Sequence, residues 1–199
     1  MPLAWPDPGI WSQSTEIMRF RATDLAGVAV IEAQPAEDER GFFARLFCLE
    51  EFAGFGLTFK PVQANLSGNR LKGTLRGLHY QVAPFEEDKL VMVRRGAIFD
   101  VAVDIRPSSP TFGRHHAEEL SADNRRALFV PRGCAHGYQT LTDEAEVFYL
   151  VSAAYQPGAE RGLRWDDPGL AIPWPQAPPT VLSAKDAAWP ESINRFKCQ

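Results

Sequence analysis

Two of the four histidines stand in surroundings that suit chemistry as well as packing. His79 lies in the stretch LRGLHYQ, and His136 ends the stretch PRGCAH, which has the form P-x-G-x-x-H. An imidazole in such a position can accept a proton near neutral pH, bind a metal ion or fill a core. His115 and His116 stand together in FGRHHAEEL, outside any recognisable site pattern, and we interpret them as surface or strand-edge residues.

The surroundings of His79 and His136 provide poorly for a metal ion. P-x-G-x-x-H is one half of the cupin signature, in which a turn delivers a histidine into a β-barrel. A metal-binding cupin usually also has H-x-H and a downstream glutamate. Here HYQ puts Gln81 in the second position, and no glutamate follows at a suitable spacing. Because a divalent metal needs about three or four N, O or S ligands, we expect no catalytic metal.

The alternative is that His79 acts as a general base, which requires an orienting partner and a substrate with an acidic proton. Basic and amide side chains suit the other end of such a substrate. Arg76 precedes His79 by three residues, Arg40 stands in EDERGFF, and Gln63 and Asn65 stand in VQANLS. Arginine forks and amide donors are suited to phosphate oxygens.

The spacing of Arg76 and His79 raises a geometric question. Residues three apart in an ideal strand point to opposite faces. The two side chains can therefore serve one site only if a bulge at Gly77 or a twisted strand edge corrects the alternation.

The composition is typical of a soluble globular protein and excludes several function classes. The 199 residues carry a net charge of -4, so no general basic field is available to nucleic acid or an anionic membrane. No apolar run approaches the ~18 residues of a membrane span, and the N-terminal stretch lacks the pattern of a secretory signal. Cys48, Cys134 and Cys198 are widely spaced, which indicates free thiols in a reducing cytoplasm.

Short β-like runs separated by turn residues dominate the chain. They cover residues 27–35, 41–49, 89–105, 126–131 and 144–155, and the Gly turn in RRGAI divides 89–105 into two strands. Within 97–105 one alternating face is apolar, as in a sheet over a core. One short helix is expected at 49–56, ending at glycine. The pattern predicts an all-β jelly-roll or cupin-like β-sandwich barrel with few short helices, formed as one domain by residues 1–199.

Several motifs together resemble the dTDP-4-dehydrorhamnose 3,5-epimerases, which are cofactor-free cupins of nucleotide-sugar metabolism. The likeness runs from about residue 25 to 187 and leaves an N-terminal extension of about 20 residues outside it. The motifs are RGFF (40–43), VQANLS (62–67), GTLRGLHYQ (73–81), DKLVMVRRGAIFDVAVDIRPSSPTFG (88–113), LSADNRRALFVPRGCAHGY (120–138), VFYL (147–150) and LSAKD (182–186).

The resemblance implies roles for individual residues. His79 matches the base that removes a proton next to a C4 ketone, and Asp186 matches its carboxylate partner. Lys89 matches the cation beside the C4 oxygen, and Tyr149 matches the acid that returns a proton to the opposite face. Matches to positions that line the nucleotide, diphosphate or sugar are Arg40, Gln63, Asn65, Arg76, His136, Glu160 and Lys185.

The resemblance therefore implies an isomerase that inverts C3 and C5 of a nucleotide-linked 4-keto-6-deoxy sugar without a cofactor. It also implies a homodimer, in which N-terminal strands carry RGFF toward the partner's site. Three alternatives stay open: inversion of C3 alone, a metal-dependent cupin, and a non-catalytic sugar-nucleotide binder.

One position departs from the family pattern. Family members typically carry an acidic residue where this chain has Arg45, and that residue faces the pyrimidine. A carboxylate accepts a hydrogen bond from thymine N3–H, whereas a guanidinium cannot accept one. The sequence thus leaves open a CDP- or GDP-linked substrate.

Overall fold

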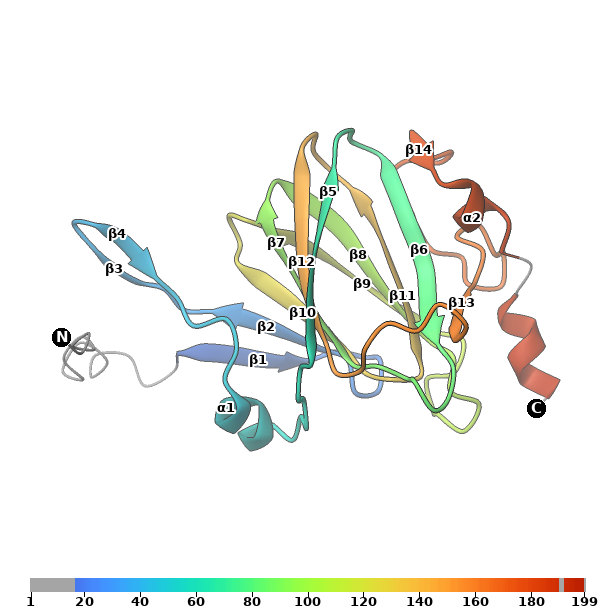
Figure 1. The fold of residues 1–199 in the computed structure, drawn as a ribbon, viewed down its shortest axis with the longest axis horizontal. Coiled ribbons are helices and arrows are strands. Elements are labelled where there is room, and N and C mark those ends of the chain that lie inside the picture. Colours follow the sequence, from blue (N-terminus) through green and yellow to red (C-terminus); the bar gives the residue numbers. More distant parts are fainter. Residues whose placement is uncertain (1–16, 190–191, 199) are drawn as a thin grey trace.

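The computed structural model describes residues 17–189 and 192–198, so most of the N-terminal extension lies outside the described residues. Two sheets face each other (Figure 1). The first has the order β1 (Met18–Ala22), β2 (Ala29–Ala33), β10 (Arg126–Val130), β7 (Lys89–Arg95), β12 (Ala145–Val151) and β5 (Gln63–Asn69). The second has the order β13 (Glu160–Gly162), β6 (Thr74–Gln81), β11 (Cys134–Thr140), β8 (Ala97–Asp104) and β9 (His115–Ser121), with β14 (Val181–Leu182) beside β6. The expected all-β, cupin-like jelly roll is confirmed.

Smaller elements surround this sandwich. A hairpin of β3 (Ala36–Asp38) and β4 (Gly41–Phe43) projects from one end, and α1 (Leu49–Gly54) follows it in the chain (Figure 1). Short α2 (Ala184–Ala187) and the 3-10 helix η2 (Ile193–Cys198) follow the last strand. Among the described residues, no helix is long and apolar enough to span a membrane.

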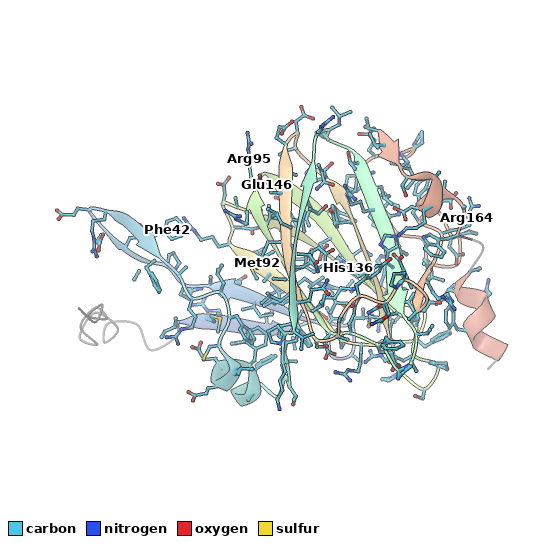
Figure 2. The ribbon with its side chains drawn as sticks, in the orientation of Figure 1. Phe42, Met92, Arg95, His136, Glu146 and Arg164 are labelled. Atoms are coloured by element: carbon cyan, nitrogen blue, oxygen red, sulfur yellow. The ribbon has the colours of Figure 1, made fainter. Side chains whose placement is uncertain are left out.

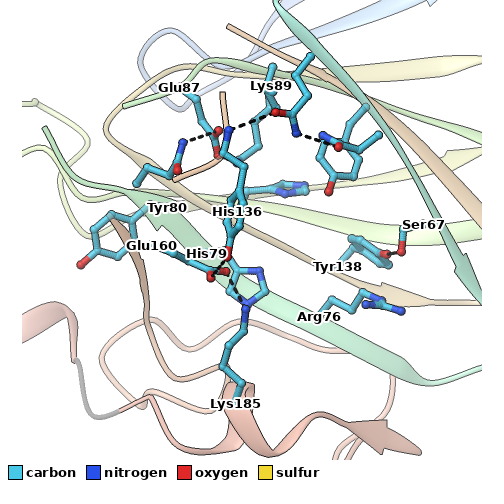
Figure 3. A pocket seen from close by; sticks show the side chains of 16 residues that line it. Ser67, Arg76, His79, Tyr80, Glu87, Lys89, His136, Tyr138, Glu160 and Lys185 are labelled. Atoms are coloured by element: carbon cyan, nitrogen blue, oxygen red, sulfur yellow. Dashed lines mark hydrogen bonds and ion pairs between the residues drawn. The ribbon is translucent and has the colours of Figure 1, made fainter. Parts of the chain in front are cut away.

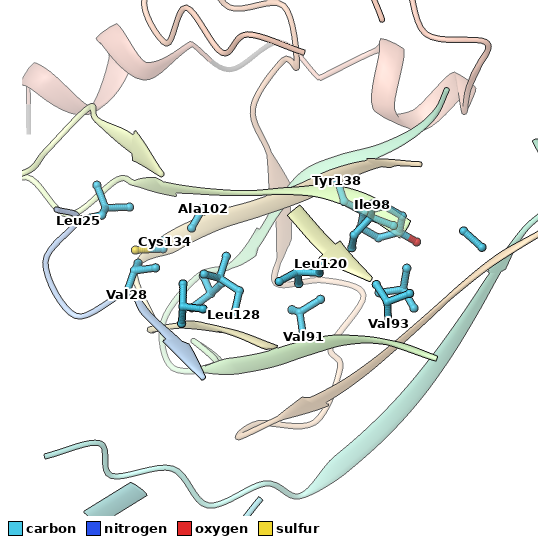
Figure 4. Close-up of a cluster of buried hydrophobic side chains, with 14 residues drawn as sticks. Leu25, Val28, Val91, Val93, Ile98, Ala102, Leu120, Leu128, Cys134 and Tyr138 are labelled. Atoms are coloured by element: carbon cyan, nitrogen blue, oxygen red, sulfur yellow. The ribbon is translucent and has the colours of Figure 1, made fainter. Parts of the chain in front are cut away.

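Side-chain alternation divides the space between the sheets into an apolar half and a polar half. On β7, Lys89 shares its face with Val91 and Val93, and the two valines belong to the buried cluster in Figure 4. On β12, Tyr149 follows Val147 on the same face and packs against that cluster. Each strand therefore runs from the apolar core into the polar region, so the sandwich itself positions these polar side chains.

The apolar face predicted within 97–105 packs on the outside of the sandwich. Val101, Val103 and Ile105 form a buried cluster with Leu163 and Leu170, which belong to the C-terminal part of the chain. The opposite face turns inward and contributes residues of the inner cluster in Figure 4, together with buried Asp100. Both faces of β8 are thus buried, although only one looks apolar in sequence.

The expectation of a strand over 41–49 is wrong for most of its length. Only Gly41–Phe43 is a strand, and the chain then continues irregularly to α1. Phe47 packs edge-on against Phe52 and Phe59. Local hydrophobicity at Phe47 therefore reflects docking of α1 on the outer face of the first sheet. The division of 89–105 at Gly96, which has φ +73°, is confirmed.

The two cysteines whose side chains are described are free thiols. Cys48 is partly exposed and Cys134 is buried. Burial raises the pKa of Cys134 to about 12, so this thiol stays protonated and unreactive. The side chain of Cys198 lies outside the described residues.

Candidate active site

The polar half of the sandwich contains a pocket of about 380 Å³. Both sheets contribute walls, and Figure 2 shows His136 lying between them. Figure 3 shows the lining side chains converging on one space. They are Gln63, Asn65, Ser67, Arg76, His79, Tyr80, Gln81, Glu87, Lys89, His136, Tyr138, Tyr149, Val151, Tyr155, Glu160 and Lys185.

His79 and Asp186 form a close pair at this pocket. The distance from His79 Nε2 to Asp186 Oδ1 is 2.6 Å. Burial works against ionisation of Asp186, but the hydrogen bond from His79 and those from Ser183 and Gly77 outweigh it and lower the pKa of Asp186. An ionised carboxylate can only accept, so Nε2 carries the hydrogen and Nδ1 keeps the lone pair of a base.

Local structure brings Asp186 to His79. Strand β14 pairs in parallel with the start of β6, which delivers the C-terminal segment to the strand that carries His79. Ser183 then caps α2 by accepting a hydrogen bond from the Asp186 amide at 3.0 Å. The four-residue helix is thereby fixed with Asp186 buried and Lys185 exposed toward the pocket rim.

A bulge in β6 lets Arg76 and His79 line the same pocket. His136 pairs with His79, but Tyr138 pairs with Arg76, so three steps on β6 match two on β11. Gly77 lies in the bulge with φ +129°, and a Cβ there would sit 2.5 Å from the Cα of Gly137. The bulge suggested by the sequence spacing is confirmed, and only glycine fits it.

Lys89 and Tyr149 belong to the first sheet, whereas His79 belongs to the second. The ammonium of Lys89 is paired with Glu87 (Figure 3). Burial, with the nearby Tyr138 and Glu87, raises the pKa of Tyr149, so its phenol is protonated and able to donate. The pocket thus holds a base on one wall and an acid on the other.

Side chains suited to binding anionic oxygens line the pocket from both sheets. Arg76 Nε donates to Asn69 Oδ1 at 2.8 Å, which orients the guanidinium. Gln63 Nε2 donates to Asn65 Oδ1 at 2.9 Å on the neighbouring strand β5. Gln63 and Asn65 line the pocket from β5 of the first sheet and Arg76 lines it from β6 of the second, so a phosphate between the sheets would find donors on both walls.

His136 and Glu160 have partners of their own. His136 Nε2 lies 2.8 Å from Oδ1 of fully buried Asp100. Glu160 accepts from Lys185 Nζ at 2.8 Å and from Tyr155 Oη at 2.7 Å. Burial opposes ionisation of Glu160, but these two partners lower its pKa.

Arg40 and Arg45 do not line this pocket. Arg40 is exposed at the hairpin turn and paired with Asp38, and Arg45 is paired with Glu51. The other ten residues singled out from the sequence all line the pocket or, for Asp186, contact His79.

Sequence reasoning missed several pocket residues, among them Glu87, Tyr138 and Tyr155. Alternation from His136 along β11 could have located Tyr138, because the two residues share a face. Glu87 lies in a connection, where no periodicity applies.

No group of three or more His, Cys, Asp or Glu side chains in the described part of the chain is arranged to hold a metal ion. Gln81, the residue in the second cupin position, is engaged by protein groups. Its Nε2 donates to Phe85 O at 3.0 Å, and its Oε1 accepts from Gln156 N at 2.7 Å.

The chain is similar to known proteins over most of its length. The family model for dTDP-4-dehydrorhamnose 3,5-epimerase matches residues 22–193. A dTDP-4-dehydrorhamnose 3,5-epimerase from Sinorhizobium fredii is 43% identical, covering 87% of this chain and 89% of that protein. A dTDP-4-dehydrorhamnose 3-epimerase from Streptomyces niveus is 39% identical, covering 85% and 81%.

A solved structure has the same architecture. It is a dTDP-6-deoxy-D-glucose-3,5-epimerase from Legionella pneumophila in complex with dTDP-4-keto-L-rhamnose. Its TM-score to this chain is 0.83 at 41% identity, and the match covers 89% of this chain and 93% of that one.

Proposed function

Because this chain belongs to the dTDP-4-dehydrorhamnose 3,5-epimerase family, we propose that it inverts C3 and C5 of a 4-keto-6-deoxy sugar linked to dTDP. The observation that carries this proposal is the His79–Asp186 pair on one wall of a pocket whose other wall holds Tyr149. Inversion next to a ketone needs a base and an acid on opposite faces of one carbon, and this arrangement supplies both.

The first step removes a proton. His79 takes the proton from C3, the C–H electron pair forms the C3–C4 double bond, and the C4 oxygen becomes an enolate oxygen. Asp186 holds the ring in the tautomer with a free Nδ1 and stabilises the imidazolium that forms. A positioned base of this kind contributes about 10²–10⁴-fold to the rate.

The second step stabilises the enolate and returns a proton. The Lys89 ammonium faces the developing charge, and a preorganised donor at such an oxygen contributes roughly 3–4 kcal/mol. The Tyr149 phenol then protonates the opposite face of C3, which completes the inversion. Proton exchange with solvent returns His79 to the neutral ring and Tyr149 to the phenol, and the same groups then act at C5, which is also next to the C4 ketone.

The nucleotide is held by the other pocket residues. The diphosphate and nucleoside are bound by Arg76, Gln63 and Asn65. The sugar is bound by His136, Glu160 and Lys185, which extend to the rim of the pocket. Tyr155 is about half exposed at the rim and offers a ring face for stacking of a base.

Assembly as a homodimer explains the two arginines that lie outside the pocket. The β3–β4 hairpin projects away from the sandwich, with Phe42 59% and Phe43 60% exposed (Figure 2). In the proposed dimer this hairpin covers the partner's pocket and brings Arg40 and Arg45 to its substrate. Light scattering at micromolar concentration should give twice the monomer mass of 22.1 kDa, and a monomer would refute this part of the proposal.

The cytoplasm is the compartment that we propose, because the widely spaced thiols fit a reducing environment. A 4-keto-6-deoxy nucleotide sugar would also be available there to a soluble enzyme. Fractionation of cells that express the chain would test this.

Incubation with dTDP-4-dehydro-6-deoxyglucose in heavy water tests the reaction. We expect deuterium at both C3 and C5 together with the inverted product. Deuterium at C3 alone would favour a 3-epimerase, and binding without exchange would leave only a sugar-nucleotide binder. Exchange that is lost on chelation and restored by a divalent metal would favour a metal-dependent cupin.

A further inference from the structure

Glu87 is a pocket residue with no role in the scheme above. It lies in the connection between β6 and β7, two residues before Lys89, and its carboxylate is paired with the Lys89 ammonium (Figure 3). The Glu87 side chain is 9% exposed and the Lys89 side chain 10% exposed. The pair is therefore largely withdrawn from water, where an ammonium needs a carboxylate or several acceptors to remain charged.

A second interaction fixes the position of the Glu87 carboxylate. Its Oε2 accepts a hydrogen bond from Gln81 Nε2 at 2.9 Å, while Oε1 faces Lys89. Gln81 is itself held by the backbone, because Oε1 accepts from Gln156 N at 2.7 Å and Nε2 donates to Phe85 O at 3.0 Å. A continuous chain of bonds thus leads from two loops, through Gln81 and Glu87, to the Lys89 ammonium.

The backbone next to Glu87 is also held. Asp88 N donates to Ser152 Oγ at 2.8 Å, and the Asp88 carboxylate accepts from Arg132 Nη2 at 2.7 Å. Asp88 is buried and Glu86 is exposed, while Glu87 between them lines the pocket. The placement of Glu87 is therefore part of the folded structure and does not depend on a bound substrate.

This arrangement addresses a weakness of lysine as an oxyanion-stabilising group. A lysine side chain has four rotatable bonds, and fixing it costs about 2 kcal/mol of rotamer entropy. Preorganised charge is effective because the cost of orienting it is met during folding and not during the reaction. A carboxylate that holds Nζ in the pocket before substrate arrives supplies that preorganisation.

We propose that Glu87 is a positioning residue for this reaction. Its carboxylate, which Gln81 fixes in place, holds the Lys89 ammonium at the point where the C4 oxygen of the substrate becomes an enolate oxygen. This inference rests on the proposed function and on the proposed role of Lys89. As the enolate forms, Lys89 shares its protons between Glu87 and the new oxyanion. Glu87 itself touches neither the sugar nor the migrating proton.

The test compares Glu87→Gln with Glu86→Gln, the same change at the exposed neighbour. Glutamine keeps the size of Glu87 and an oxygen for Gln81, but it lacks the charge. We expect Glu87→Gln to lower kcat for deuterium exchange at C3 by roughly tenfold to a hundredfold, with KM changed by less than about threefold, and Glu86→Gln to match wild type. An unchanged or higher kcat, or a loss confined to KM, would overturn the proposal.

A double-mutant cycle with Lys89→Met separates positioning through Lys89 from a general structural effect. We expect Glu87→Gln to have no further effect on the residual exchange rate of Lys89→Met, whereas multiplied losses would refute action through Lys89. If Glu87→Gln fails to fold, Glu87→Asp provides the kinetic test. Aspartate keeps the negative charge but is one methylene shorter, which moves the carboxylate away from the Lys89 ammonium. Its kcat should therefore fall while KM is preserved. Absence of exchange by wild type would instead refute the proposed function.

Discussion

His79 and Asp186 lie 107 residues apart in the chain, yet His79 Nε2 is 2.6 Å from Asp186 Oδ1. The side chain of Asp186 is 4% exposed and that of His79 is 28% exposed. The carboxylate is therefore hidden behind a ring that remains open to the pocket. This is the geometry expected of a general base that faces the substrate and is oriented from behind by a buried carboxylate.

Replacement of His79 should abolish proton exchange while the fold survives. We expect His79→Ala to lower the C3 exchange rate by at least about 10²–10⁴-fold, because the variant lacks the imidazole that accepts that proton in the proposed mechanism. Asp186→Asn should cost less, but still more than about tenfold, because an amide can hold the ring in the wrong tautomer. Exchange followed by NMR in heavy water measures both, with His115→Ala as a histidine control outside the pocket; near-wild-type exchange by His79→Ala would show that another group is the base.

Removal of the Tyr149 hydroxyl should separate proton removal from proton delivery. In Tyr149→Phe we expect epimerised product to fall by at least about 10²-fold, while some exchange at C3 remains, since His79 and Lys89 are intact. The phenol oxygen is lost but the ring still packs against the buried cluster. Equal loss of exchange and of product would show that Tyr149 takes part in ionising the substrate.

Asp104 should make the stability of the protein depend on pH in the acid range. Burial opposes its ionisation, but hydrogen bonds from Arg106, Ser109 and Thr111 outweigh burial and lower its pKa to about 2. Because the pKa is about 3.9 in an unfolded chain, ionised Asp104 contributes about 2 kcal/mol above that value, and this contribution is lost as pH falls toward about 2.

Denaturant unfolding of wild type and Asp104→Asn measures this contribution. The difference in unfolding free energy should be about 2 kcal/mol at pH 7 and clearly smaller at pH 3. A difference that stays constant between these pH values would mean that the variant loses packing or hydrogen-bond geometry and not charge.

Arg45 should weaken discrimination in favour of dTDP if it reaches the base in a partner's site. Arg45→Glu restores an acceptor for thymine N3–H, and one matched hydrogen bond is worth about 1–3 kcal/mol. We therefore expect it to raise the preference for dTDP over CDP and GDP by about tenfold or more in competitive binding. Arg95→Glu, on the exposed end of β7, is the control. Tight dTDP binding by wild type that Arg45→Glu leaves unchanged would show that Arg45 does not contact the base.

The sequence by itself determined the strand-rich architecture and the position of several turns. Alternation and turn residues act over a few positions, so the division at Gly96 and the short helix before Gly56 could be recognised locally. The odd spacing of Arg76 and His79 also showed that a bulge at Gly77 or a twisted strand edge was needed, because side chains three apart in a regular strand point to opposite faces, and the register of β6 against β11 identifies the bulge. Residues 44–48 could not be assigned correctly, since their apolar side chains pack with α1 and pair with no strand.

Only the tertiary structure decided which groups meet. The apolar face of β8 packs outward because the C-terminal segment covers it, and no local pattern in 97–105 records that cover. Asp186 reaches His79 because β14 pairs with β6, which is a contact between distant segments. Glu87 is held beside Lys89 by Gln81, which is fixed in turn by the amide of Gln156 in the loop after β12. Such partners depend on where separate segments are brought together by burial and strand pairing, and the spacing of residues along the chain does not contain that information.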